Sequence, residues 1–282
     1  MVLLFHNLKK GLNIMEKNTP DYHFRRNTDI IPNPKDYELH NHYGAYEIFI
    51  FLNGDADYIV EGTVYPLKKY DTLILSPNEF HHIIHHSSTK YERVVLHINN
   101  SFFTRFDCDE FRRMFDSRKI GTKNLIPASF IIENKVMDII ERAEKYEKDS
   151  NNDIVIRCII LELLHVLNKY HHSSTPSSGN TKITPVIMYI NENLSSSLSI
   201  ENISEKFFLN KYYLCRIFKK YTGLTINKYI THKRIAMVKD LYQQGKTLTQ
   251  ASIESGFGNY SNFYKMYVKE TDRSPREDMK DI

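Results

Sequence analysis

The chain has 282 residues, of which 41% are hydrophobic and 26% are charged, the balance of an ordinary globular protein. This composition excludes disordered and fibrous proteins, and the longest apolar run near the start, Val2 to Phe5, is too short for a signal peptide or a membrane span. Three scattered cysteines give neither a disulfide framework nor a zinc finger. We therefore expect a cytoplasmic protein with no membrane partner.

The net charge of +4 is unevenly distributed along the chain. Residues 1–181 carry 22 basic and 24 acidic side chains, whereas residues 182–282 carry 16 and 10, so the two parts have net charges of −2 and +6. Attraction to DNA phosphates requires such a basic part, although the same excess also occurs on plain solvated surfaces.

The first 132 residues are predicted to contain an arm and a sheet domain. Residues 1–20 show no sustained periodicity and include a second methionine, Met15, so they form an arm or an extension upstream of the true start. In the sheet domain, residues 21–132, short runs rich in Ile, Val, Tyr and Phe are separated by turn residues, which predicts a barrel or sandwich of many short strands. Residues 58–65 predict a hairpin with Gly62 in its turn.

Helical periodicity follows and predicts a helix pair within residues 133–170. The second of these helices, residues 154–170, is apolar over more than half its circumference. Two interpretations stay open: one wide face packs against its own domain, or part of that surface meets a second subunit in a homodimer. Residues 171–182 are rich in Ser, Thr, Pro and Gly and predict a linker, so a C-terminal domain begins at residue 183.

The first of two helix-turn-helix patterns lies within residues 183–282. Its second helix begins after a predicted N-cap, Asn210. One apolar stripe at helical spacing is formed by Leu214, Ile217, Phe218 and Tyr221. The opposite face, which a DNA-reading helix would insert into the major groove, carries Tyr212, Cys215, Arg216 and Lys219. The alternative is that Arg216 and Lys219 are only solvated surface cations.

The second pattern repeats this arrangement about fifty residues later. Its apolar stripe contains Phe263, Met266 and Tyr267, and its opposite face carries Ser261, Tyr264 and Lys265. Between the two patterns, residues 226–244 predict one long helix that ends before Gly245. If this helix holds the two reading helices about one DNA turn apart, roughly 34 Å, one chain can reach successive major grooves.

Several residues of this part carry a known family pattern. They are Leu214-x-Arg216-x-Phe218-Lys219-Lys220-x-Thr222-Gly223 in the first unit, and Gly256-Phe257, Phe263 and Ser274-Pro275 in the second. In these motifs the domain resembles the AraC-type (AraC/XylS) transcription regulators. The resemblance implies promoter DNA and RNA polymerase as partners. It maps the base contacts onto Tyr212, Cys215 and Arg216, and onto Tyr260, Ser261, Tyr264 and Lys265.

The second unit departs from that family pattern at four places. Ala251-Ser252, Tyr267-Val268, Asp272 and Asp278 stand where the family has Ile-Ala, Phe-Lys, Gly and Tyr. With fewer apolar side chains and additional acidic groups, the second unit is predicted to pack less tightly or to bind DNA phosphates more weakly.

The sheet domain contains a histidine pattern that resembles the two cupin motifs. It runs His40-x-His42-x-x-x-x-Glu47-x-x-x-x-x-x-Gly54 and then Pro77-x-x-x-His81. In metal-binding cupins the matching positions, here His40, His42, Glu47 and His81, hold one divalent ion. Sensor cupins of the AraC type usually keep parts of this pattern without metal, so we expect these four residues to bind a small-molecule effector and expect no cofactor. His82, His85 and His86 are expected on the surface.

These observations predict an α+β protein of two domains: a cupin-like β-barrel with a trailing helix pair, then an all-α bundle with two helix-turn-helix units. The predicted function is a sequence-specific transcription regulator, an activator and not an enzyme, that responds to a small molecule such as a sugar. Two alternatives are a metal-dependent cupin enzyme, which leaves the basic domain unexplained, and a constitutive dimeric DNA-binding protein.

Overall fold

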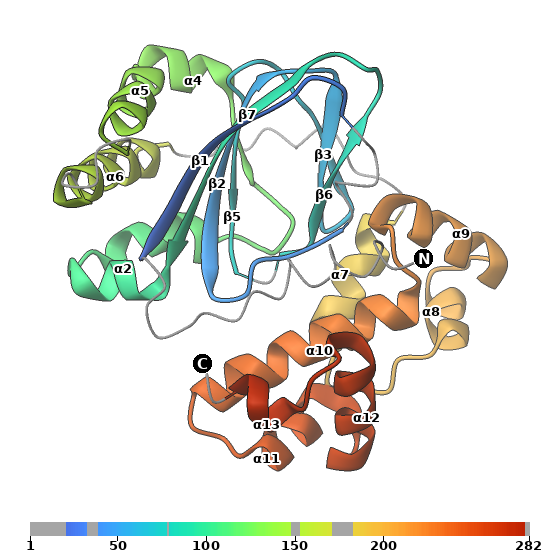
Figure 1. The fold of residues 1–282 in the computed structure, drawn as a ribbon. Helices are drawn as coiled ribbons and strands as arrows, with labels where there is room; N and C mark the ends of the chain where they lie inside the picture. The colour runs from blue at the N-terminus through green and yellow to red at the C-terminus, as the bar shows by residue number, and fades with distance from the viewer. Residues whose placement is uncertain (1–20, 33–38, 78, 148–152, 171–182, 280–282) are drawn as a thin grey trace.

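The computed structural model describes residues 21–32, 39–77, 79–147, 153–170 and 183–279. The predicted arm at residues 1–20 and the predicted linker at residues 171–182 lie outside the described residues. A sheet-rich N-terminal half with helices on one side lies against an all-helical C-terminal half (Figure 1).

Two antiparallel sheets form the N-terminal half, in the strand orders β1-β7-β2-β5-β8 and β4-β3-β6. Their strands are β1 (Tyr22–Asp29), β2 (Ala45–Asn53), β3 (Ala56–Val60), β4 (Thr63–Pro66), β5 (Thr72–Leu75), β6 (His81–His85), β7 (Tyr91–Asn99) and β8 (Leu125–Ile126). No ladder joins the two sheets within the described residues, so the predicted barrel is an open two-sheet form. The predicted hairpin is present as β3 and β4, with Glu61 and Gly62 at φ 48° and 76° in the turn.

The central strand β2 shows why the sheets lie where they do. Successive side chains of a strand point to opposite faces, and both faces of β2 are buried. Ile48 and Ile50 face the core under the helices, whereas Phe49 and Phe51 face the core between the two sheets. A strand buried on both sides requires the continuous apolar run that the sequence has here.

Helices cover the outer face of the larger sheet (Figure 1). They are α2 (Asn100–Arg105), η2 (Asp109–Arg112), α3 (Arg113–Asp116), α4 (Ala128–Glu133), α5 (Val136–Glu147) and α6 (Asp153–Asn168). The wide apolar face of α6 packs against its own domain through residues such as Ile160, Leu163 and Leu164. Ile154 stays 60% exposed on the same helix.

The C-terminal half is the predicted all-α bundle. Its elements are α7 (Thr184–Glu192), α8 (Ile200–Lys206), α9 (Lys211–Thr222), α10 (Ile226–Gln243), α11 (Leu248–Ser252), η3 (Ile253–Phe257), α12 (Tyr260–Thr271) and α13 (Pro275–Asp278). The predicted N-cap is confirmed, because the Asn210 side chain accepts the backbone N–H groups of Tyr212 and Tyr213. The predicted end of α10 is confirmed by Gly245 at φ 90°.

The bundle has two cores that share α10. One core surrounds Leu214 and Phe218 of α9, and the other surrounds Phe263 and Tyr267 of α12. The first half of α10 contributes Tyr229 and Ile230 to the first core, and its second half contributes Ile235 and Val238 to the second. The predicted stiff connector is therefore a structural part of both units.

The predicted loose packing of the second unit is wrong. Asp278 is 3% exposed, accepts a 2.5 Å hydrogen bond from the Tyr267 hydroxyl and lies 3.5 Å from the Lys239 ammonium. Asp272 ends α12 in the left-handed conformation, at φ 58°. The acidic residues at these positions thus have local roles, because a buried Lys supplies the counter-charge and Asp tolerates the left-handed region better than most residues.

Candidate functional site

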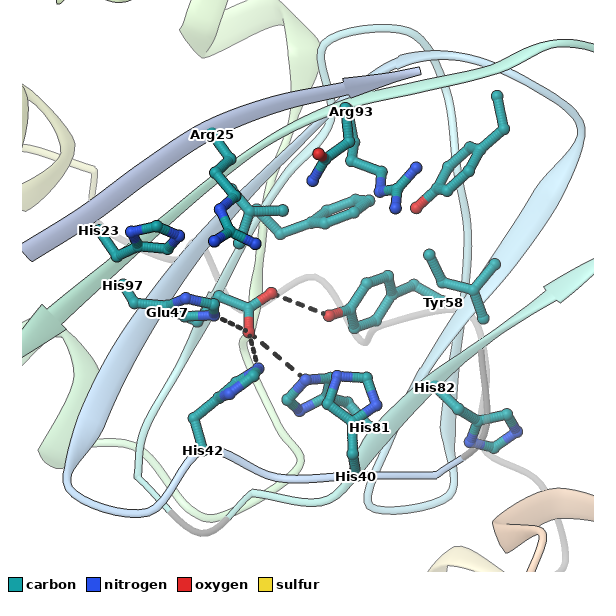
Figure 2. A pocket seen from close by; sticks show the side chains of 15 residues that line it. His23, Arg25, His40, His42, Glu47, Tyr58, His81, His82, Arg93 and His97 are labelled. Atoms are coloured by element: carbon teal, nitrogen blue, oxygen red, sulfur yellow. Dashed lines mark hydrogen bonds and ion pairs between the residues drawn. The ribbon is translucent and has the colours of Figure 1, made fainter. Parts of the chain in front are cut away.

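A cavity of about 230 Å³ lies in the N-terminal half, with walls from both sheets (Figure 2). Its polar floor consists of Glu47 from β2, Tyr58 from β3, His81 from β6, His97 from β7, and His40 and His42 from the segment before β2. The structure therefore brings together all four residues that the cupin-like motifs indicate: His40, His42, Glu47 and His81.

Glu47 is the hub of this floor and is only 3% exposed. Its Oε2 atom lies 2.8 Å from His42 Nε2, 3.2 Å from His97 Nε2 and 3.4 Å from His81 Nε2. Its Oε1 atom accepts a 3.3 Å hydrogen bond from the Tyr58 hydroxyl. One carboxylate thus organises three imidazoles and a phenol (Figure 2).

The charges in the floor depend on one another. Burial alone would raise the pKa of Glu47, but His81 and His42 hold that pKa well below its usual value. Burial lowers the pKa of His42 to about 4, although Glu47 acts in the opposite direction. Burial also opposes the charge of His81, yet the attraction of Glu47 raises the pKa of His81 overall. Glu47 and His81 therefore each favour the charged form of the other.

The sequence patterns did not identify His97. His97 lies directly opposite Glu47 in the pairing of β2 with β7. Tyr91, Arg93, Val95 and His97 of β7 all line the cavity, and they alternate with residues such as Val94 and Leu96 that face the core under the helices. This period of two was the available signal. Motif matching missed His97 because it lies outside both cupin-like motifs.

Two overlapping sets of donors in the floor could hold a metal ion. The ligand atoms of His40, His42 and His81 lie within 4.8 Å of one another, and so do those of His42, Glu47 and His97. Imidazole and carboxylate donors suit zinc, iron or manganese. The Nδ1 atom of His81 lies 2.8 Å from the Glu79 carbonyl oxygen, which fixes Nδ1–H as the donor and leaves Nε2 facing the cluster. The residues therefore fit a divalent ion, which would polarise an oxygen of a bound molecule.

The other walls of the cavity carry two arginines, Arg25 and Arg93, and the buried His82. Arg93 pairs with Asp29 and lies over the Tyr91 ring at 4.4 Å. Arg25 is exposed and projects over the floor (Figure 2). The expectation that His82 is a surface residue is wrong, because His82 is 8% exposed, lines the cavity and has its pKa lowered to about 4 by burial.

The second candidate site is the outer face of the helical half. On α9, Tyr212 is 78% exposed, Arg216 and Lys219 are exposed, and Cys215 is half-buried against the first core. On α12, Ser261, Tyr264 and Lys265 are exposed and Tyr260 is half-buried against the second core. The apolar stripes of both helices face inward as predicted: Leu214, Phe218, Phe263 and Tyr267 are buried, and Ile217, Tyr221 and Met266 are half-buried.

The two faces are exposed on separate helices of one bundle. The basic and aromatic side chains of α9 and α12 stay accessible while the N-terminal half is in place. None of the helices in the described ranges combines the length and apolarity that crossing a bilayer demands.

Comparisons with known proteins identify relatives of this chain. A family model described as a helix-turn-helix domain matches residues 203–281. The HTH-type transcriptional activator RhaS of Klebsiella pneumoniae is 18% identical over 240 residues, which cover 84% of this chain and 86% of that protein. The melibiose operon regulatory protein of Escherichia coli is 28% identical over 116 residues, covering 41% of this chain and 38% of its own length. The solved structure of ToxT from Vibrio cholerae is 14% identical, covers 93% of this chain and 99% of ToxT, and has a TM-score of 0.36.

Proposed function

We propose that this chain, which belongs to the AraC-type family of DNA-binding transcription regulators, reads promoter DNA with both α9 and α12. The observation that carries the proposal is the pair of exposed helix faces mounted on one rigid helix, α10. A helix that begins with a capped, accessible first turn can present that turn to base edges in the major groove.

Each reading helix combines two kinds of contact. On α9 we assign base contacts to Tyr212, Cys215 and Arg216, and phosphate contact to Lys219, because guanidinium groups pair with guanine while a lysine acts as a point charge. On α12 we assign contacts to Tyr260, Ser261, Tyr264 and Lys265. The half-burial of Cys215 and Tyr260 favours close apolar contact with a base or sugar rather than long reach.

Selection of duplexes from a random-sequence library tests the reader. We expect the full chain to enrich a site in which two short protected patches lie about one turn, roughly 10 base pairs, apart. Affinity for that site should fall steeply with salt concentration because bound lysines and arginines displace counterions. A library that yields no enriched site, or one patch only, would contradict the bipartite reader.

The cavity of the N-terminal half is proposed as the effector site. At about 230 Å³ it is smaller than the roughly 300–1,000 Å³ pockets of drug-sized ligands, so it fits a small polar molecule such as a sugar. Hydroxyl groups of a sugar can donate to Glu47 and accept from Tyr58 and the imidazoles. The proposal needs no metal, because the Glu47 carboxylate already has the imidazoles of His42, His81 and His97 within 3.4 Å.

A thermal-shift screen of monosaccharides and divalent ions on the full chain tests the effector site. A molecule that binds only the folded state raises the melting temperature. A sugar that does so in the wild type but not in Glu47→Gln would identify the site and the ligand class. A melting temperature raised by Zn²⁺ or Mn²⁺ instead, and lost in His42→Ala, would contradict the metal-free site.

The remaining parts of the proposal concern assembly. We propose that residues 21–132 form the effector domain, residues 133–170 the dimerisation region and residues 183–282 the DNA-binding domain, with residues 171–182 as linker. A homodimer would use the outer side of α6, where Ile154 and Cys158 are exposed. The name of RhaS as a transcriptional activator supports activation, and we propose that it occurs in the cytoplasm by contact with RNA polymerase.

A further inference from the structure

One short segment forms part of both the cavity and the DNA-binding half. In residues 39–43, His40 and His42 line the cavity. The residues between and beside them face the other way: Leu39 packs against the first helical core, and Asn41 and Tyr43 line a small space beside α10 and α12. Alternation with a period of two is that of an extended chain. The cavity wall is therefore also a docking surface.

This segment contacts both helix-turn-helix units. Leu39 lies at the end of α9, with its Cβ 3.6 Å from where a Cβ of Gly223 would be. The Tyr43 ring lies 4.9 Å from the Lys239 ammonium, and the space it lines includes Glu270 of α12. The N-terminal half thus packs against both units, which already share α10.

Phe80 and His81 repeat the same alternation on the next segment. Phe80 is 2% exposed inside the first helical core, 5.6 Å from the Tyr229 ring, whereas His81 lines the cavity. Two backbone hydrogen bonds of 3.1 and 2.9 Å join His40 to His81. A shift of His40 or His81 in the cavity therefore moves residues that pack on the helical half.

Glu61, in the turn between β3 and β4, joins the halves by charge. Its side chain is buried, and its Oε1 atom accepts from the Phe80 backbone N–H at 2.7 Å and from the Lys233 ammonium. Its Oε2 atom accepts from the Tyr229 hydroxyl and from Asn191 Nδ2 at 3.3 Å. A buried carboxylate with four donors, three of them from the other half, is costly to separate from its partners.

The fit beside Glu61 leaves no spare room. The Gly62 carbonyl accepts a 3.2 Å hydrogen bond from the Thr184 hydroxyl. A Cβ at Gly62 would lie 2.2 Å from Ile187 Cδ1. The β3–β4 turn is seated against α7 and α10 by shape as well as by charge.

We infer that the buried Glu61–Lys233 pair is a lock that holds the halves together and weakens DNA binding, and that a ligand in the cavity releases it through residues 39–43. The inference rests on the proposed function. Docking sets a half of net charge −2 against a half of net charge +6. The acidic half therefore reduces the attraction of the reading helices to DNA phosphates.

The test uses Lys233→Met, Glu61→Gln and the double variant in the full chain. Removing one partner leaves a buried unpaired charge, whereas removing both charges leaves a neutral contact of similar size. We expect each single variant to increase the radius of gyration in X-ray scattering and to tighten binding to the selected duplex about fivefold or more. The double variant should return both quantities toward wild-type values. In the single variants, the backbone amides of His40 and His81 should also exchange hydrogen faster.

The matched control is Lys119→Met. Lys119 pairs with Glu192 across the same boundary at 2.6 Å, but both side chains are more than half exposed, so its loss should change neither quantity. Tyr229→Phe removes one hydrogen bond to Glu61 and should increase the radius of gyration and the DNA affinity by less than the charge variants do. It replaces them in the test if a charge variant does not fold.

Three outcomes would overturn the lock. They are single variants that stay compact, single variants that open without tighter DNA binding, and a double variant as open as the singles. Opened variants with unchanged exchange at His40 and His81 would overturn the route through residues 39–43. If no duplex is selected by the wild type, the proposed function fails instead, so the two failures are distinguishable.

Discussion

The cavity of the N-terminal half and the proposed reading faces of the C-terminal half place their polar groups in opposite ways. In the cavity the functional groups are buried and hold one another, as Glu47 does with His42, His81 and His97. On α9 and α12 the functional groups point to solvent, and the apolar sides of the same helices supply the stability. Substitutions in the first region should therefore change folding and binding together, whereas those in the second should change binding alone.

The largest effect is expected inside the second helical core. Asp278→Ala leaves Lys239 buried without its carboxylate and removes the acceptor of the Tyr267 hydroxyl, so the free energy of unfolding should fall by about 3–5 kcal/mol. Urea unfolding followed by circular dichroism measures it. Glu254→Ala, which breaks an exposed pair with Lys246, should change that free energy by less than about 0.5 kcal/mol. Equal losses in the two variants would contradict the buried pair.

Next in size is the loss of discrimination at one base. Arg216→Ala should relax the preference of the selected duplex at one position by about 1–3 kcal/mol without lowering the melting temperature, because Arg216 is exposed. Lys219→Ala should weaken binding to all duplexes alike. Competition binding with single-base variants of the duplex separates the two. If Arg216→Ala keeps its specificity, this base contact is misassigned. A lower melting temperature would contradict the expectation that substitutions on α9 change DNA binding alone.

A smaller effect is expected from the helix cap of the second unit. The Thr247 and Gln250 side chains at the start of α11 form a capping box, so Thr247→Ala should lower the free energy of unfolding by about 1 kcal/mol. Ser274→Ala removes the same kind of box at α13 and is the matched comparison. A neutral Thr247→Ala would mean that α11 is held by packing alone.

The smallest change in stability, with a clear change in assembly, is expected on α6. Ile154→Asp alters a side chain that is 60% exposed, so folding should be unaffected while self-association is lost. Sedimentation velocity measures the assembly. A sedimentation coefficient equal to that of the wild type would remove α6 from the proposed interface.

Features with local causes were predictable from the sequence. The capped start of α9 at Asn210, the end of α10 before Gly245 and the hairpin turn at Gly62 each depend on one or two neighbouring residues. The motif spacing also indicated His40, His42, Glu47 and His81, because these residues follow the cupin-like pattern, and all four line one cavity.

Features that depend on distant partners were not predictable. Glu61 looks like an ordinary turn residue until Lys233, 172 positions away, is placed beside it. Asp278 looked like a defect because its counter-charge, Lys239, lies on another helix. His82 was expected on the surface, but it is 8% exposed and lines the cavity between the two sheets. In each case burial decides the role, and burial is a property of the whole fold.

The sharing of α10 between two cores constrains how such a molecule can change over time. Each residue added to an α-helix advances it by about 1.5 Å and turns it by about 100°. One insertion between Ile230 and Ile235 would swing α12 to another side of the axis relative to α9, far out of phase with the duplex. If both helices read successive grooves as proposed, the length of α10 must match the pitch of DNA, so this helix should tolerate exchanges of side chains far more readily than any change in residue number.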